Sequence, residues 1–115
     1  MEAARALADL VEISPQIEAA AILGEDARIA GLVGVPDARA DVLARSLREL
    51  LEGAGAFRGD NGRVTQIHAE LGDGQVFAVT DAGERTIVAV TAGRTAPGLL
   101  FYDLKRCLSA LGDET

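Results

Sequence analysis

The sequence predicts an α/β (α+β) fold: one five-stranded, mostly antiparallel sheet sandwiched by helices, in the order helix, two strands, helix, three strands, helix. Two segments, residues 37–54 and 97–111, carry leucines at helical spacing. Five short apolar runs separated by turns containing Gly or Asp have the length and alternation of strands. The chain has 115 residues and a hydrophobic fraction of 49%, enough for one core without disulfides. We therefore expect a single domain over residues 1–115.

A short helix and a β-hairpin are predicted at the N-terminus. Residues 2–13 place apolar side chains on one helical face, and Pro15 ends the helix because proline disfavours helical backbone in the residue before it. Residues 17–23 and 27–33 are apolar runs on either side of a Gly-Glu-Asp turn. This pattern indicates two hairpin strands.

The long helix predicted over residues 37–54 has three sides. The apolar stripe expected to pack on the sheet comprises Ala40, Leu43, Leu47, Leu50, Leu51 and Ala54. The opposite side is charged and comprises Asp41, Arg45, Arg48 and Glu52. Between them runs a third sector of mostly small residues, Val42, Ser46, Glu49 and Gly53. Ser and Gly are poor helix formers, so this sector indicates either close approach by another helix or, at Gly53, the start of the helix end.

The C-terminal half is predicted to form a three-stranded meander and a closing helix. A Gly-rich loop over residues 53–62 precedes strands at residues 64–71, 75–80 and 86–91. The first of these strands alternates apolar and polar residues and is expected to be half-exposed. The helix over residues 97–111 directs Leu100, Leu104, Cys107, Leu108 and Leu111 to the core, and Tyr102, Lys105, Arg106 and Ser109 to solvent.

Composition argues against several classes of partner. The net charge is -7 and aromatic residues make up only 3%, which disfavours nucleic acid and polybasic membrane-surface binding. The N-terminus does not resemble a signal peptide, and no apolar run approaches the ~20 residues of a membrane span, so we expect a cytoplasmic protein. Ten of the eleven basic residues are Arg, which together with the many Ala residues suggests a GC-rich bacterial genome.

No residue pattern indicates catalysis. His68 is the only histidine and lies on the polar side of a predicted half-exposed strand, where an edge or interface position explains it better than a catalytic triad. Cys107 is the only cysteine and lies in a buried stripe. A phosphate-binding loop needs a lysine after glycines, whereas Lys105 lies within a helix. We therefore expect no enzymatic activity, no cofactor and no metal.

In the order of its elements and several local turns, the sequence resembles the Roadblock / dynein light-chain-7 family over roughly residues 3–111. The matching features are the short first helix before the strand Ile17–Leu23 and its tight hairpin, the Leu-rich helix followed by a Gly-rich loop, the meander, and a closing helix that begins Pro97-Gly98-Leu99-Leu100 and continues Asp103-Leu104-Lys105-Arg106. The chain departs from the family at Asp26-Ala27, where many members have an acidic residue followed by Gly.

The resemblance implies a symmetric homodimer in which the long helices lie side by side and the strands at residues 64–71 pair across the two-fold axis. Bacterial members of the family regulate a Ras-like GTPase, so the resemblance implies a non-enzymatic regulator or scaffold in signalling or polarity. Activation of the GTPase by positioning of the GTPase's own switch residues is one mode of action, and inhibition and scaffolding alone stay open. We assign the dimer interface to Val42, Ser46, Glu49, Gly53, Thr65, Ile67 and His68. We assign GTPase docking to Arg39, Asp41, Arg45, Arg48 and Glu52. A proline at Ile67 is expected to remove a ladder donor and to split or aggregate the protein.

Two alternative functions stay open. A small-ligand sensor of PAS-like or profilin-like layout needs a cavity with convergent polar groups. A light-chain-like adaptor subunit shares the dimer and differs only in its partner.

Overall fold

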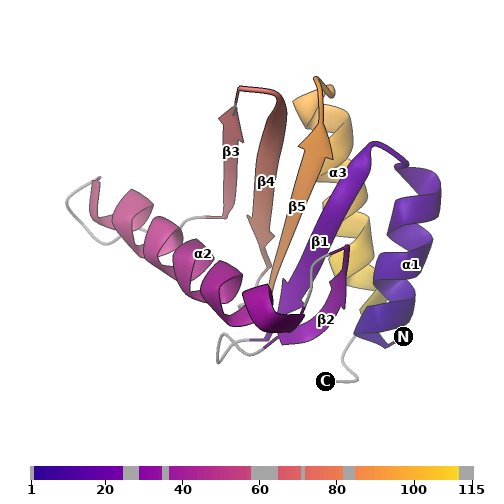
Figure 1. Ribbon diagram of the computed structural model, residues 1–115, viewed down its shortest axis with the longest axis horizontal. Helices are drawn as coiled ribbons and strands as arrows, with labels where there is room; N and C mark the ends of the chain where they lie inside the picture. The colour runs from indigo at the N-terminus through magenta and orange to yellow at the C-terminus, as the bar shows by residue number, and fades with distance from the viewer. Residues whose placement is uncertain are drawn as a thin grey trace.

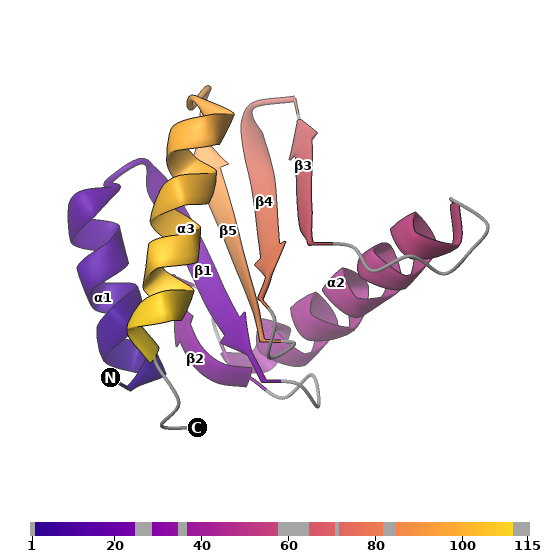
Figure 2. The same ribbon diagram turned by 180° about the vertical axis from the view of Figure 1, so that it is seen from behind.

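Helices cover both faces of a five-stranded sheet, as the sequence predicts (Figure 1 and Figure 2). The computed structural model describes residues 2–24, 29–34, 37–57, 65–70, 72–81 and 85–111. Helices α1 (Ala3–Ile13) and α3 (Pro97–Leu111) lie side by side on one face of the sheet. Helix α2 (Asp37–Phe57) lies on the other face.

The sheet is antiparallel throughout. Its strands are β1 (Ile17–Leu23), β2 (Ile29–Val33), β3 (Gln66–Glu70), β4 (Gly74–Thr80) and β5 (Thr86–Ala92). Their spatial order is β2-β1-β5-β4-β3, and every neighbouring pair is antiparallel. The last three strands form the predicted meander, which leaves β2 and β3 at the two edges of the sheet.

Element boundaries differ from the predicted ones, most clearly at the end of α2. The helix runs to Phe57, so the prediction of a loop beginning at Gly53 is wrong. Gly53 is exposed, and a glycine there costs a helix only about 1 kcal/mol relative to alanine, so the helix continues through it. The second predicted strand begins at Ile29, and the third spans residues 66–70. The predictions for residues 25–28 and 58–64 lie outside the described residues.

Alternate side chains of the strands form two cores. The larger core lies beneath α1 and α3, and on β1 it takes Ala20 and Ile22. The smaller core lies beneath α2, where β1 contributes Ala21 and Leu23. The fully buried side chains of the larger core include Leu7, Phe77, Ile87, Leu100, Leu104 and Leu108.

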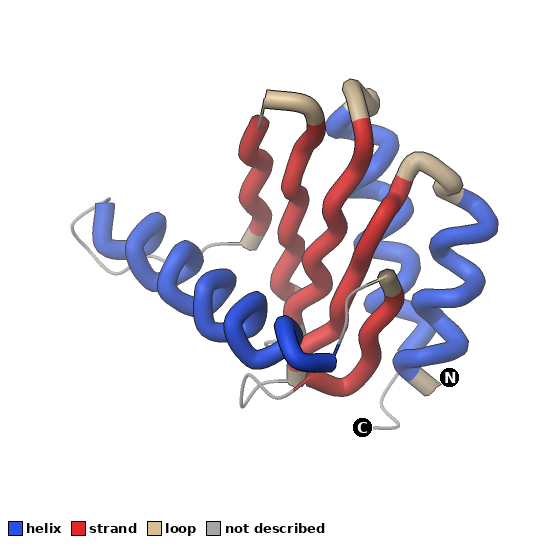
Figure 3. Tube along the Cα trace, in the orientation of Figure 1, coloured by secondary structure: helices blue, strands red, loops and turns tan. Residues whose placement is uncertain are grey.

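Helix α2 packs on the sheet through only part of its predicted apolar stripe. Leu47 is 5% exposed and Leu51 is half-buried, whereas Leu50 is 45% exposed and Ala54 is also exposed. The expectation that Leu50 and Ala54 face the sheet is therefore wrong. The C-terminal end of α2 projects past the β3 edge, so none of the five described strands lies beneath it (Figure 3).

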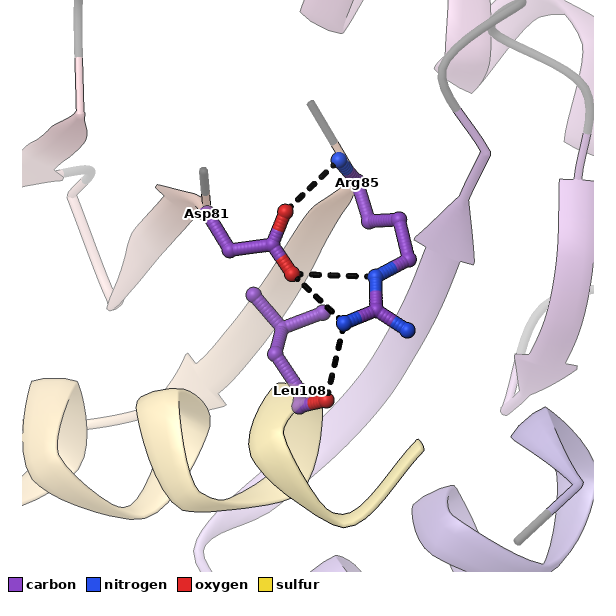
Figure 4. A network of polar contacts seen from close by, with 3 residues as sticks. All are labelled: Asp81, Arg85 and Leu108. Carbon is purple, nitrogen blue, oxygen red and sulfur yellow. Dashed lines mark hydrogen bonds and ion pairs between the residues drawn. The ribbon is translucent and has the colours of Figure 1, made fainter. Parts of the chain in front are cut away.

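A polar contact ties the β4–β5 hairpin to α3 (Figure 4). Arg85 donates from Nε to Asp81 Oδ2 and from its backbone N–H to Asp81 Oδ1, both at 2.9 Å. An Nη2 of the same guanidinium donates to the Leu108 carbonyl oxygen at 3.5 Å. The cation thus lies at the C-terminal end of α3, where the helix dipole favours positive charge.

Candidate interaction surface on β3 and α2

Strand β3 has backbone groups that face away from the sheet. The Thr80 N–H donates to the Thr65 carbonyl oxygen at 2.9 Å, so these residues form a hydrogen-bonded pair next to the β3–β4 ladder. Such pairs alternate with pairs that are not hydrogen-bonded, so the backbone groups of Ile67 and Ala69 also face β4. The groups that face the open edge are those of Gln66, His68 and Glu70. This edge can accept another strand.

Ile67, which was assigned to the dimer interface, pairs through its backbone with the chain's own strand β4. Its N–H points toward β4, and its side chain packs against the smaller core beneath α2. A proline at Ile67 would therefore remove a donor of the β3–β4 ladder, and an outward donor is removed only by a proline at Gln66, His68 or Glu70. His68 is the central residue of β3 whose N–H faces outward.

The His68 side chain lies on the sheet face opposite α2, the same face as Phe77. The two rings stack, with centroids 4.5 Å apart and planes 4° apart. Gln75 Oε1 accepts from the Thr95 N–H at 2.8 Å, so the Gln75 amide nitrogen donates to His68 Nε2, 3.0 Å away. The imidazole is thus held as a hydrogen-bond acceptor in an edge strand.

The third sector of α2 is open to solvent. Val42 is 59% exposed, and Ser46, Glu49 and Gly53 are exposed as well. A Cβ atom added to Gly53 would meet nothing within 4 Å. Leu51 of α2 and Ile67 of β3 pack against the same small core, so α2 and β3 are held to one part of the sheet. We call the two together the α2–β3 surface, which consists of Val42, Ser46, Glu49, Leu50 and Gly53 of α2 and the open edge of Gln66, His68 and Glu70.

All five residues assigned to GTPase docking are solvent-exposed on α2: Arg39, Asp41, Arg45, Arg48 and Glu52. Arg48 Nε lies 3.4 Å from Glu52 Oε1, and the two side chains are 64% and 70% exposed. Such an exposed pair contributes little to stability, and both groups remain available to a partner. Thr65, assigned to the dimer interface, is exposed just before β3.

Cys107 is a buried core residue, as the sequence predicts. Its side chain donates from Sγ to the Ala6 carbonyl oxygen at 3.5 Å. Burial, with a smaller contribution from the Asp9 carboxylate, raises the pKa of the Cys107 thiol to about 11. A thiol with this pKa is protonated at neutral pH and is a poor nucleophile.

Neither a metal cluster nor a membrane span is found in the part of the chain that the structure describes. No group of three or more His, Cys, Asp or Glu side chains there is placed to hold a metal ion. None of the described helices is long and apolar enough to cross a membrane.

A groove between α1 and α3 is not apparent from the sequence. It encloses about 190 Å³ between Asp9, Leu10 and Ile13 of α1 and Asp103, Arg106 and Cys107 of α3. One sequence feature could have pointed to this groove: Ile13 is an apolar residue outside the apolar face of the first helix. Its side chain is 68% exposed.

Comparison with solved structures places this chain in a known fold, although no family model and no curated protein matches its sequence. A Roadblock/LC7 domain from Streptomyces avermitilis is similar with a TM-score of 0.74 and 23% identity, over 90% of this chain and 89% of that one. The gliding protein MglB from Thermus thermophilus is similar with a TM-score of 0.70 and 15% identity, over 93% and 85%. LokiProfilin2, solved in complex with rabbit actin, is similar with a TM-score of 0.69 and 20% identity, over 96% of both chains. The predicted Roadblock fold is therefore confirmed, and profilins share its layout.

Proposed function

We propose that this chain is a non-enzymatic, dimeric regulator or scaffold of a small Ras-like GTPase in a bacterial cytoplasm. The observation that carries the proposal is the α2–β3 surface, which combines an open strand edge with an exposed helix sector of small residues and leucine. The Roadblock resemblance supplies the class of partner, and the fold is consistent with it.

A second copy of the chain fits the α2–β3 surface. Two β3 strands can pair antiparallel about a two-fold axis, because such an axis brings the same patch of each copy into contact. The pairing satisfies the backbone groups of Gln66, His68 and Glu70 and joins two five-stranded sheets. The same axis brings the two α2 helices together, where the small side chains at Ser46 and Gly53 permit close approach.

The charged side of α2 is the proposed GTPase-docking face. Arg45 and Arg48 are exposed there beside Asp41 and Glu52. Arg is enriched among the residues that dominate interface energies, so this mixed-charge face suits a partner surface that combines apolar and charged groups.

A regulatory rather than enzymatic role is supported by the state of the reactive side chains. The Cys107 thiol is buried and protonated at neutral pH, and the His68 ring is held by Phe77 and Gln75. We expect no heat of binding when GTP or ATP with magnesium is titrated into the isolated chain. Sub-millimolar nucleotide affinity would contradict this part of the proposal.

The proposal is tested by mass and by partner binding. Sedimentation equilibrium at tens of micromolar should give twice the chain mass of 11.9 kDa. Ras-like GTPases from the same genome, loaded with a GTP analogue, should then bind the dimer in biolayer interferometry. A monomer that binds none of them would overturn the proposal.

A profilin-like binding module is the second candidate, favoured by the TM-score of 0.69 to LokiProfilin2. Such a module needs no dimer, so a monomeric mass combined with saturable binding of actin would favour it. The open edge of β3 argues for the dimer, since an unpaired edge is a liability in a monomer.

A further inference from the structure

Exposed apolar side chains gather on two separate surfaces of the molecule. Of the five large hydrophobic side chains exposed in the described residues, Val42 and Leu50 belong to α2. The other three are Ile13 of α1, 68% exposed, and Leu99 and Tyr102 of α3, 60% and 57% exposed. Helices α1 and α3, which carry these three residues, lie on the face of the sheet opposite α2 (Figure 2). Of the three, Ile13 lines the groove between the two helices.

The groove between α1 and α3 is held in place by two contacts. Ser14, just after α1, donates from Oγ to Asp103 Oδ2 at 2.7 Å. Farther along the helices, Cys107 Sγ donates to the Ala6 carbonyl oxygen. Ala6, Leu10 and Cys107 are all buried in the larger core, so the floor of the groove is apolar and does not depend on a ligand for its shape.

The walls of the groove carry carboxylates that have no cationic partner among the described residues. No ion pair to Asp9 is formed within that part of the chain, although its charge is close enough to act on the Cys107 thiol. Asp103 accepts its hydrogen bond from the neutral Ser14 hydroxyl. Arg106, the cation of the groove, lies 5.8 Å from the centre of the Tyr102 ring. The lining thus carries two carboxylates and one guanidinium. Because negative charge is in excess and the floor is apolar, the groove complements a ligand that is both apolar and basic.

We propose that the α1–α3 groove binds an amphipathic helix from a partner protein. The helix inserts aliphatic side chains, spaced i and i+3 or i+4, over Leu10 and Cys107, and it places Lys or Arg side chains against Asp9 and Asp103. A proline-rich segment suits an aromatic-lined groove, whereas this floor is aliphatic and Tyr102 is not among its lining residues.

The groove is separate from the α2–β3 surface. The sheet lies between the groove and α2, and β3 is at the opposite edge of the sheet from β2, against which α1 packs. A protein with both surfaces can hold a GTPase on one side and a helical partner on the other. The proposal thus goes beyond the proposed function and does not depend on it.

The test uses a synthetic alanine-based peptide of about 18 residues, long enough to form helix, with leucines on one face and lysines along one flank. Titrated into the full chain labelled with ¹⁵N, it should bind saturably and shift the amide signals of Ala6, Leu10 and Ala110. Asp9→Lys should weaken binding about fivefold. Glu12→Lys, the same charge change on the same helix outside the groove lining, should leave the affinity within about twofold of wild type.

Two further arms make the groove test decisive. Ile13→Ala removes an exposed side chain and should weaken binding without unfolding the protein. His68→Pro, which addresses the dimer edge, should leave peptide binding intact, so failure of the dimer and failure of the groove are distinguishable. Shifts confined to α2, equal losses in Asp9→Lys and Glu12→Lys, or tighter binding of a proline-rich peptide would each overturn the proposal.

Discussion

The side-chain amide of Gln75 donates to His68 Nε2 across the β3–β4 pair at 3.0 Å. Gln75 is only 3% exposed, whereas His68 is exposed on the edge strand. The carbonyl oxygen of the same amide accepts from the Thr95 N–H in the segment between β5 and α3. One buried glutamine therefore connects the proposed dimer edge to the start of the closing helix.

Replacing Gln75 should destabilise the fold. Gln75→Leu leaves the Thr95 N–H without its acceptor and removes the donor to His68, so the free energy of unfolding should fall by about 1–3 kcal/mol. Urea denaturation followed by circular dichroism measures this change. Gln66→Leu, at an exposed glutamine of β3, is the matched control and should change stability by less than about 0.5 kcal/mol. Equal effects of the two substitutions would contradict the role of Gln75.

The dimer should depend on the outward N–H of His68 and not on its imidazole. His68→Ala keeps this donor and should sediment as a dimer, whereas His68→Pro removes it and should sediment as a monomer at tens of micromolar. Both variants lose the contacts to Phe77 and Gln75, so their difference isolates the backbone donor. Ile67→Pro should instead unfold β3, because its N–H faces β4. Dimeric His68→Pro would move the interface elsewhere.

Local patterns predicted most of the fold. The alternation around His68, the apolar run from Thr86 and the stripe from Leu100 each placed an element correctly. The end of α2 could not be predicted in this way, because two glycines weaken a helix but do not stop it where nothing else competes. Leu50 was misplaced because helical spacing groups residues on one face but does not fix how the helix is rotated about its axis. Leu47 and Leu51 pack on the sheet, and Leu50 is turned away from it.

Features that depend on contacts between distant segments could not be predicted from the sequence. The stacking of His68 on Phe77 and the direction of the Ile67 N–H follow from the register of β3 against β4, which spacing alone does not fix. The α1–α3 groove joins residues about 90 positions apart, such as Asp9 and Asp103, and only the packing of the two helices brings them together.

The buried thiol predicts a loss of stability at alkaline pH. The pKa of Cys107 is raised from 9.0 to about 11 in the folded chain, so above pH 9 the unfolded state releases this proton first. The contribution of the thiol to folding is therefore fully present below pH 9 and declines between about pH 9 and 11. Urea midpoints measured over this range should fall more steeply for wild type than for Cys107→Ala. Parallel slopes would show that the thiol is not buried as described.

The Arg85 contact should stabilise the β4–β5 hairpin against α3. Arg85→Ala removes the pairing with Asp81 and the donor to the Leu108 carbonyl oxygen, and it should cost about 1–3 kcal/mol of stability. Arg85→Lys keeps the charge but loses the planar fork that reaches both partners, so it should recover only part of the loss. Thermal unfolding of wild type, Arg85→Lys and Arg85→Ala under the same conditions should give midpoint temperatures that fall in that order. If Arg85→Lys were as stable as wild type, the positive charge alone, and not the planar guanidinium, would account for the contribution of Arg85.

The charged side of α2 should set affinity for a GTPase without affecting the dimer. Arg45→Glu with Arg48→Glu changes two exposed side chains. Among the described residues it breaks one ion pair, the solvated pair of Arg48 with Glu52, so the fold should survive. Binding to a Ras-like GTPase should fall tenfold or more, which corresponds to ~1.4 kcal/mol. Arg94→Glu with Lys105→Glu makes the same charge change at exposed positions outside α2 and should leave affinity within about twofold. A dimer of normal mass that binds equally well in both double variants would place the docking site on another face.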